Sequence, residues 1–227
     1  MNTKTVFNGF TPDVFQFFAD ISENNCKAWF DKHKDVYTGT VVPQMKAFFN
    51  ALSPAVYSID SRMNLNPVKA ISRIYRDIRF SKDKSPYKTC MWIGFQRMMP
   101  DWKTFPGYFI EVRETGYNYG MGIFTAQRKD MDTFRSLVGY DTDGFIKISN
   151  DIINKHHFMI EGEIYKRKIA NDLPECLQQW IQRKGIYVHK DLPRDHLLGN
   201  PAIADYIAGE FIALKPLYDF FVEVCEP

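Results

Sequence analysis

Hydrophobic residues recur at helical spacing along the first quarter of the chain. Thr11, Pro12 and Asp13 supply an N-cap residue, a proline at the first helical position and an acidic residue in the first turn. Apolar side chains then return every three or four residues, which indicates an amphipathic helix. Two further helices are predicted in the same way, over residues 25–37 and from 43 to about 54.

The pattern becomes strand-like in the middle of the chain. Residues 87–95, 107–112 and 117–124 mix aromatic and β-branched side chains. A turn signal at residues 114–116 separates the last two segments. We predict that the three segments are strands of a largely antiparallel sheet.

Helical spacing returns in the second half of the chain. Helices are predicted over residues 126–137, 144–153 and 173–184, and a strand over residues 158–165. The last helix is predicted to start with Asn200 as N-cap and Pro201 at its first position, and to reach Leu217. Pro216 should kink this helix or split it in two.

Helices at both ends of the chain and strands between them predict an α+β fold. It has N-terminal helices, a central and largely antiparallel sheet, and C-terminal helices. No linker or internal repeat divides the 227 residues, of which 45% are hydrophobic. We therefore expect a single domain over residues 1–227.

The four cysteines lie far apart in the sequence and form no C-x-x-C pair, which excludes a zinc-ribbon or thioredoxin-like pattern. No metal-binding or cofactor-binding motif occurs, so neither group is expected. The polar residues 1–5 and the lack of a long apolar run predict no secretion signal and no membrane span. We expect free thiols in a reducing cytoplasm, and the sequence does not indicate an oligomeric state.

Positive charge is concentrated in one segment, the cationic island. Between residues 69 and 88 the chain has seven basic residues: Lys69, Arg73, Arg76, Arg79, Lys82, Lys84 and Lys88. Only Asp77 and Asp83 oppose them, which gives a local charge of +5, whereas the other 22 basic and 25 acidic residues give −3. The small net charge of +2 does not predict a general polyanion binder, but it conceals this positive island in a slightly acidic protein.

A helix is the slightly favoured conformation for the first part of the island. Asn66 and Pro67 make a good helix start, and three isoleucines within residues 71–78 follow at helical spacing. The isoleucines would pack inward, with the three arginines on the opposite side. An extended strand is the alternative, and it leaves Arg76 on the wrong face. Residues 81–86 are predicted to form a turn that leads into the first strand.

The side chains of the island are suited to anions. An arginine offers a planar fork of donors for a phosphate or carboxylate, and a lysine adds a mobile point charge. We predict a site for a small phosphate- or carboxylate-bearing ligand, with Lys69, Lys82 and Lys88 as background charge. Asp77 is the candidate catalytic residue, acting as a base or orienting an arginine. The candidate ligand-binding residues are Arg73, Arg76, Arg79, Lys84 and Tyr87.

Two other interpretations of the island stay open. In the first, the island is the binding patch of a non-enzymatic module for nucleic acid, which the acidic remainder of the chain makes less favoured. In the second, the charges are structural. They then form surface pairs, Arg76 with Asp77 or Arg79 with Asp83, or a buried Arg–Asp network that fixes a helix against the sheet.

The island also resembles a known signature. Residues 73–87 read R-I-Y-R-D-I-R-F-S-K-D-K-S-P-Y. This resembles, at all eight specified positions, the pattern R-x-x-R-D-x-R-F-x-x-[DN]-K-x-x-Y of the bacterial domain-of-unknown-function 2461 family. Lys166 and Arg167 resemble a later element of that family, without its Pro- and Asp-rich stretch. The resemblance extends over nearly the whole chain and implies a single domain, but it implies no particular activity.

Other candidate residues have simpler explanations. Asn25 is best explained as a helix N-cap, and Cys90 as a small buried hydrophobe. His156 and His157 would point to opposite faces of a strand, so they do not predict a metal site. Residues 191–196 are expected to form a polar loop. Aromatic residues beside a basic patch can stack nucleobases. Four aromatic residues of the predicted strands could do so, although core packing explains them more simply: Tyr108, Tyr117, Tyr119 and Phe124.

Overall fold

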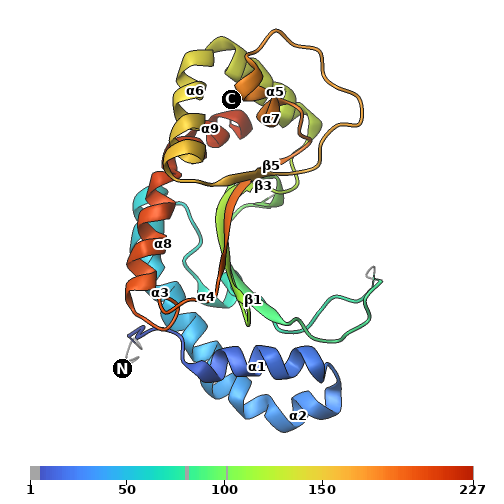
Figure 1. The fold of residues 1–227 in the computed structure, drawn as a ribbon, viewed down its shortest axis with the longest axis vertical. Helices are drawn as coiled ribbons and strands as arrows, with labels where there is room; N and C mark the ends of the chain where they lie inside the picture. The colour runs from blue at the N-terminus through green and yellow to red at the C-terminus, as the bar shows by residue number, and fades with distance from the viewer. Residues whose placement is uncertain (1–5, 80–81, 101, 227) are drawn as a thin grey trace.

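A curved antiparallel sheet organises the fold, and Figure 1 shows it nearly edge-on in a computed structural model. The structure describes residues 6–79, 82–100 and 102–226; the polar residues 1–5 and two residues of the predicted turn and signature, Phe80 and Ser81, lie outside these ranges. The strands are β1 (Cys90–Phe95), β2 (Gly107–Arg113), β3 (Gly116–Ile123), β4 (Met159–Glu161) and β5 (Ile186–Pro193). Their order is β1-β2-β3-β5-β4 with antiparallel pairing throughout. The prediction of an α+β fold around a largely antiparallel sheet is confirmed.

Helices precede and follow the strands. The N-terminal helices are α1 (Pro12–Glu23), α2 (Lys27–Val36), α3 (Val42–Ile59) and the single turn α4 (Pro67–Ala70). The later helices are α5 (Arg128–Tyr140), α6 (Thr142–Asn150), α7 (Glu175–Ile181), α8 (Ala202–Ala213) and α9 (Lys215–Cys225). π-helical turns at Tyr37–Val41 and Asp151–Lys155 follow α2 and α6, and Trp102–Thr104 forms a 3-10 turn. Within the described ranges, no helix is both long and apolar enough to cross a membrane.

The convex face of the sheet forms the core with α3, α8 and α9 (Figure 1). Alternate residues of β1, β2 and β3 are fully buried on this face: Met91, Ile93, Phe95, Tyr108, Ile110, Val112, Tyr117, Tyr119 and Met121. Aromatic rings join the layers, since Phe95 stacks on Phe49 of α3 at 5.1 Å and Tyr108 lies 4.9 Å from Phe211 of α8. Three of the four aromatic residues that the sequence offered for stacking, Tyr108, Tyr117 and Tyr119, therefore belong to the core.

Helix α3 runs past the residue at which its end was predicted. The sequence places the end near Pro54, because a proline inside a helix removes a hydrogen bond and costs about 3 kcal/mol. The helix continues to Ile59 with Pro54 on its exposed side. Val56 and Ile59 are buried, and burying such a side chain contributes ~1.5–3 kcal/mol. Burial of the last turn therefore offsets the cost of the proline.

The sheet differs from the prediction beyond β3. The strand expected over residues 158–165 is reduced to β4, because Gly162 takes a φ of +135° and turns the chain. Strand β5 was not predicted, and Asp191, which was placed in a polar loop, lies within it. Lys190 and Asp191 interrupt the apolar pattern that normally marks a strand.

The last predicted helix is split at Pro216, as expected. Helix α8 ends at Ala213 and α9 begins at Lys215, with Pro216 in its first turn. Because α8 packs on α3 and α9 packs on α5, the break carries the chain from the N-terminal helices to the later ones.

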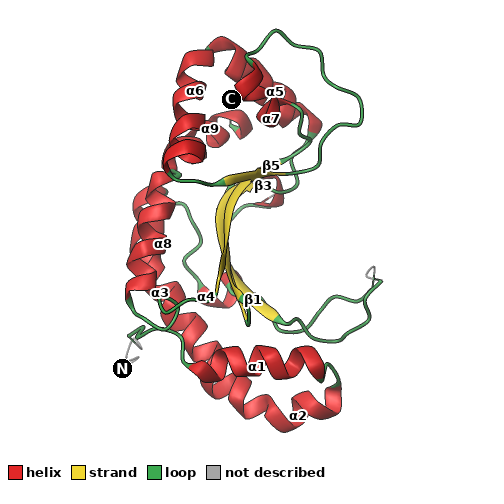
Figure 2. Cartoon of the chain, in the orientation of Figure 1, coloured by secondary structure: helices red, strands yellow, loops and turns green. Residues whose placement is uncertain are grey.

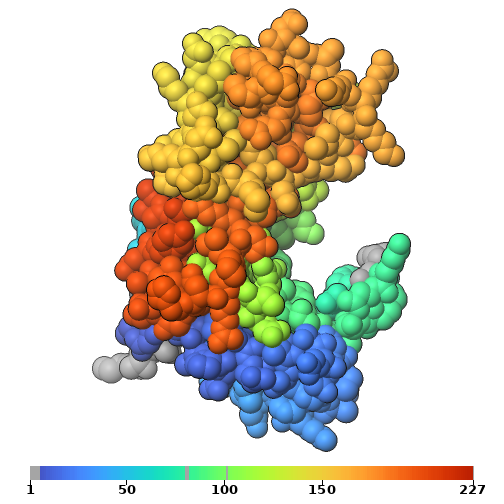
Figure 3. Space-filling model, viewed as in Figure 1, coloured from blue at the N-terminus to red at the C-terminus, as the bar shows by residue number. Residues whose placement is uncertain are grey.

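The concave face of the sheet lies beside a projecting segment. Residues 71–79 and 82–88, which we call the arm, join α4 to β1 and are drawn as loop in Figure 2. Figure 3 shows a hollow between the arm and the upper helices, on the side of the sheet opposite α3 and α8. The part of the cationic island that lies in the arm therefore projects from the body of the protein, at one rim of this hollow.

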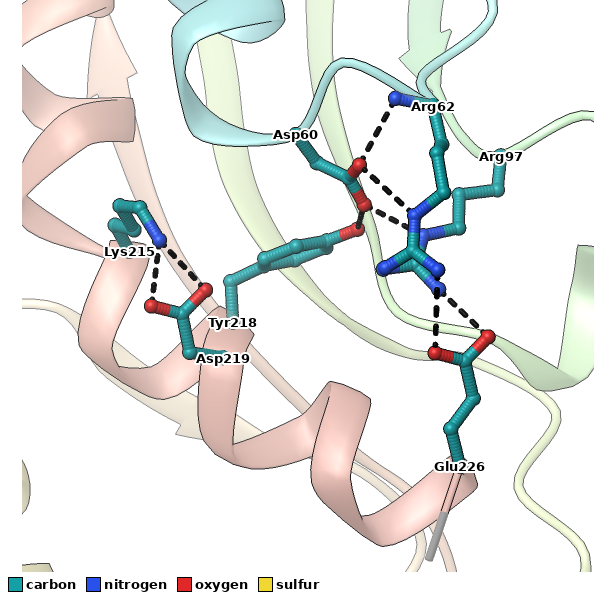
Figure 4. A network of polar contacts seen from close by, with 7 residues as sticks. All are labelled: Asp60, Arg62, Arg97, Lys215, Tyr218, Asp219 and Glu226. Atoms are coloured by element: carbon teal, nitrogen blue, oxygen red, sulfur yellow. Dashed lines mark hydrogen bonds and ion pairs between the residues drawn. The ribbon is translucent and has the colours of Figure 1, made fainter.

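A partly buried ion network fixes the end of α9 (Figure 4). Arg97 donates through Nε to Asp60 at 2.5 Å and through Nη1 to Glu226 at 2.8 Å. The Tyr218 hydroxyl donates to the same Asp60 carboxylate at 2.7 Å, and Arg62 contacts both carboxylates from the solvent side. The network ties the end of α3, the segment after β1 and the end of α9 together.

Candidate functional site

The helix predicted over the cationic island ends after one turn. Asn66 caps it as expected, since its side chain accepts a hydrogen bond from the Val68 backbone N–H at 3.0 Å. Helix α4 nevertheless stops at Ala70. The isoleucines that follow do not form one buried stripe, because Ile74 is fully buried and Ile78 is 37% exposed. The helix prediction for the arginine segment is therefore wrong.

The arm is extended, and its two sides are joined by backbone hydrogen bonds. These bonds run from Ser72 N–H to the Trp92 carbonyl, from Arg76 N–H to the Pro86 carbonyl and from Lys88 N–H to the Ile74 carbonyl. They replace the bonds between residues four apart that an α-helix would use. The extended conformation, which the sequence left as the alternative, is the one observed.

The base of the arm is fastened to the N-terminal helices. The Asn25 side chain makes two hydrogen bonds of 3.0 Å, one to the backbone carbonyl and one from the backbone N–H of Tyr87. The buried Tyr87 ring stacks on Phe30 of α2 at 4.3 Å, and Tyr75 from the other side of the arm packs against both rings. Asn25 is not the N-cap of α2, because Cys26 occupies that position. The structure thus places Asn25 and Tyr87 together as the anchor of the arm.

Two arginines of the island pair with its two acidic residues. Arg76 Nη1 lies 2.5 Å from an oxygen of Asp83, whose other oxygen accepts bonds from the backbone and hydroxyl of Ser85. Arg79 binds the Asp77 carboxylate with two hydrogen bonds, of 2.9 and 2.7 Å. The partners are exchanged relative to the pairs considered from the sequence. The Asp77 and Asp83 side chains are 59% and 49% exposed, so a buried Arg76–Asp77 network is not formed.

These contacts decide the protonation of the two carboxylates. Hydrogen bonds from Arg79 hold the pKa of Asp77 at about 2, and hydrogen bonds from Ser85 lower the pKa of Asp83. A carboxylate with a pKa of about 2 is a weak base at neutral pH. The geometry therefore supports Asp77 as the residue that orients Arg79 and gives no support to Asp77 as a general base.

The remaining cations are spread along the arm. Arg73, Lys82 and Lys84 are exposed, and Lys84 Nζ donates to the Ile78 carbonyl at 2.9 Å. Arg73 and Arg79 are six residues apart, which in an extended chain corresponds to as much as ~20 Å between their backbones. The candidate arginines are therefore distributed along a line and do not surround a single point.

A second group of side chains lies on the concave face of the sheet, beside the base of the arm. One row across the strands consists of Trp92, Glu111, Asn118 and Asp191, and the next of Gly94, Phe109, Gly120 and His189. These positions alternate with the core residues of the same strands. Most were not singled out from the sequence. Alternation is the signal for them, once the covered face of the sheet is known.

His189 lies between two polar side chains of this face. It is 6% exposed, with Nδ1 3.0 Å from Nδ2 of Asn118 and Nε2 3.4 Å from the Glu161 carboxylate. Glu161 also accepts a hydrogen bond from the Tyr187 hydroxyl, which lowers the Glu161 pKa and raises the pKa of Tyr187 to about 12. At neutral pH this group presents an ionised carboxylate and a neutral phenol on the floor of the hollow.

Aromatic side chains border a cavity of about 440 Å³ on the same face. The aromatic lining residues are Trp92, Trp102, Phe109 and Phe124. Trp92, Trp102 and Phe124 are 37%, 36% and 47% exposed, which is high for rings of this size gathered at one place. Exposed aromatic side chains that are clustered in this way are typical of binding surfaces. Phe124, the fourth residue of the proposed stacking surface, thus differs from the three buried tyrosines.

The structure gives no support for a catalytic role of Cys90 or a metal-binding role of His156. Cys90 donates to the Glu111 carboxylate at 3.4 Å, and burial raises the pKa of its thiol to about 12, so it is not an activated nucleophile. His156 follows a π-helical turn, where Nδ1 lies 3.4 Å from Glu210, and does not lie in a strand. In the part of the chain that the structure describes, no three His, Cys, Asp or Glu side chains are grouped to hold a metal ion.

Comparison with known protein families identifies the family of the chain. A family model described as "Conserved hypothetical protein (DUF2461)" matches residues 13–220, which include the arm and the whole sheet. The family identified from the signature is therefore confirmed. No curated protein matches the chain.

Proposed function

We propose a function for this chain, which belongs to the domain-of-unknown-function 2461 family: it binds the phosphates of nucleic acid along the arm. The observation that carries the proposal is the display of the cationic island on an extended, projecting arm (Figure 1). Phosphate recognition is shared with the alternative, a small phosphorylated ligand held by the same cations. The spacing of those cations favours the longer ligand.

An extended arm matches a linear polyanion. Arg73 is exposed on one side of the arm, and Lys82 and Lys84 are exposed on the other. The first and last candidate arginines are separated by up to ~20 Å, whereas a nucleic acid strand repeats its phosphates every few ångströms. A nucleic acid strand could contact several of these cations at once, whereas a single small anion could contact one or two.

Internal pairing leaves the arm positively charged. Asp77 and Asp83 each neutralise one arginine. No carboxylate among the residues that the structure describes pairs with the other five basic residues of the island: Lys69, Arg73, Lys82, Lys84 and Lys88. Because the rest of the chain has a net charge of −3, the arm attracts a polyanion more strongly than the rest of the chain does on average.

The proposal is for binding and includes no chemical step. The only catalytic candidate from the sequence, Asp77, has a pKa of about 2 and is held by Arg79. Arg76 and Arg79 then serve mainly to shape the arm, and Arg73 and the lysines meet the ligand.

Fluorescence anisotropy with a labelled single strand of about 20 nucleotides tests the proposal. We expect binding at about 50 mM salt. In a plot of the logarithm of the association constant against the logarithm of the salt concentration, the slope should be about −0.7 for each phosphate contact. Arg73→Ala and Lys82→Ala should each reduce that slope by about 0.7–1. Arg128→Ala, on α5 and with a side chain 88% exposed, is the matched control.

Two results would contradict the proposal. One is no binding of the strand at low salt. The other is an unchanged salt slope in Arg73→Ala and Lys82→Ala, equal to that of the control. A mononucleotide could also be tested as a competitor of the labelled strand. If it displaces the strand at the same molar concentration as an unlabelled oligonucleotide does, the result would instead support the small phosphorylated ligand.

We propose a reducing, cytoplasmic location from the state of the thiols. All four cysteines are free, and Cys26 and Cys176 are exposed. Exposed unpaired thiols are typical of proteins kept under reducing conditions. Cell fractionation should find the protein with cytoplasmic markers, and its recovery in an envelope fraction with oxidised cysteines would refute this.

A further inference from the structure

Two cavities on the concave face of the sheet share a wall next to the base of the arm. The first is the aromatic cavity of about 440 Å³, and the second has a volume of about 260 Å³ and is lined in part by Asn64 and Lys69. Trp92, Gln96 and Trp102 belong to both linings. A cavity rich in aromatic residues thus adjoins a cavity to which Lys69 contributes.

Trp92 connects these cavities to the arm. Its backbone N–H donates to the Ser72 hydroxyl at 3.1 Å, and its carbonyl accepts from the Ser72 N–H at 2.8 Å. Lys88 lies in the arm, two residues before the first residue of β1. Lys88 Nζ lies 5.6 Å from the centre of the Trp92 ring. A ligand that follows the cations of the arm therefore reaches Trp92 next.

The first cavity suits one flat ring. Phe109 and Phe124 meet edge to face at 5.4 Å and form one wall, and Trp92 and Trp102 contribute to the rest. A side chain at Gly94 would place its Cβ 3.2 Å from the Trp92 ring, so the glycine lets that ring lie close to the sheet. The volume falls within the ~300–1,000 Å³ of small-molecule sites.

The edge of the cavity offers polar groups and positive charge. Gln96 and Thr125 supply an amide and a hydroxyl that can bond the edge of a base. Arg113 lies between two carboxylates of this face, with Nη1 3.1 Å from Glu111 and Nη2 paired with Asp191, so it offsets part of their negative charge. Lys103 lies with Nζ 5.5 Å from the centre of the Trp102 ring. An aromatic ring that carries an anionic group therefore fits better than a neutral apolar molecule.

We infer that the paired cavities hold one unpaired nucleotide of a single strand, with its base stacked in the aromatic cavity and its phosphate facing Lys69. This inference rests on the proposed function and specifies it. Stacking on exposed aromatic side chains is the usual way in which proteins hold single-stranded bases. A duplex keeps its bases stacked on one another and has none to insert. Single strands are therefore the preferred ligand.

The test compares a single strand of about 12 nucleotides with the duplex of the same sequence, by anisotropy at one salt concentration. The wild type should bind the single strand at least ~10-fold more tightly. Trp92→Ala and Phe124→Ala should each weaken single-strand binding ~5- to 100-fold and change duplex binding less than about twofold. Tyr140→Ala, at a ring 91% exposed on α5, is the matched control and should change neither.

Equal affinity for the two forms would overturn the inference, as would Trp92→Ala and Phe124→Ala variants that behave like the control. In either case binding that depends on Arg73 would leave the proposed function standing. Failure of the proposed function looks different, since neither form of nucleic acid would then bind. Circular dichroism checks the fold of each variant, and Phe124, which follows the end of β3, provides the test if Trp92→Ala does not fold.

Discussion

The ion network at the end of α9 permits a direct comparison of a buried and an exposed arginine (Figure 4). Arg97 and Arg62 contact the same two carboxylates, Asp60 and Glu226. The Arg97 side chain is 6% exposed and the Arg62 side chain is 59% exposed. Replacing each arginine in turn by alanine removes the same kind of pair from the interior and from the surface.

The Arg97→Ala substitution is expected to lower the free energy of unfolding by about 3 kcal/mol. Removing one partner of a buried pair costs ~3–5 kcal/mol, because the other charge is left buried without compensation. Asp60 keeps three hydrogen bonds, from the Arg62 backbone N–H at 2.9 Å, from Arg62 Nε at 3.3 Å and from the Tyr218 hydroxyl at 2.7 Å, so the lower end applies. Arg62→Ala removes exposed contacts and should cost only ~0–1 kcal/mol.

Thermal unfolding followed by circular dichroism measures both losses. Each kcal/mol shifts the Tm of a chain of this size by ~2–4 °C, so Arg97→Ala should melt ~6–12 °C lower and Arg62→Ala less than ~4 °C lower. Lys215→Ala, which removes an exposed pair with Asp219 on α9, is the surface control. Equal shifts for the two arginines would refute the view that burial, and not the number of contacts, determines what these pairs contribute.

The remaining predictions concern the arm and the thiols. Arg76→Ala should lower the Tm by less than ~4 °C, because its partner is exposed; a larger loss would indicate a buried network. Asn25→Ala should speed hydrogen exchange in residues 72–88, measured by mass spectrometry, whereas Asn24→Ala should not; equal rates would exclude the Asn25 anchor. At about pH 8, Ellman's reagent should react quickly with two thiols and slowly with two others, because burial raises the pKa of the slow pair to about 12. A higher pH should speed the reaction of the slow pair. Equal rates for all four thiols would contradict the burial. The fast pair is Cys26 and Cys176, and the slow pair is Cys90 and Cys225.

Elements marked by local signals were predicted well. Thr11 and Pro12 place the start of α1, and Pro216 places the break between α8 and α9, because caps and prolines act within one turn of helix. Strands β1 to β3 were found from their aromatic and β-branched residues. In each case the side chains that decide the conformation lie within a few residues of the position predicted.

The arm shows where local pattern fails. Isoleucines at helical spacing favoured a helix, and Asn66 does start one. A helix of about a dozen residues is only marginally stable by itself, and here the backbone of Ser72 finds its partner at Trp92, twenty residues away. Such distant pairing, together with the burial of Tyr87 against Phe30, decides the conformation and leaves no trace in the local spacing.

The candidate site was predicted only in its charged part. Both faces of β1 and β2 are rich in apolar residues, so Trp92 and Phe109 on the concave face could not be told from core residues such as Ile93. Which face is exposed depends on where α3 and α8 pack, and the sequence does not encode that locally. His189 was missed for a related reason, since β5 itself was not recognised.

Pairing within the signature changes which charges can meet a ligand. Arg76 pairs with Asp83 and Arg79 pairs with Asp77, so these four residues mainly shape the arm. The lysines outside the signature looked like background charge in the sequence. In the structure Lys88 lies beside Trp92 and Lys69 lines the second cavity, where the arm meets the sheet. Under the proposed function, the two ion pairs and Tyr87 of the signature hold the arm in place. Arg73, the lysines and the aromatic residues of the concave face provide the contacts to the nucleic acid.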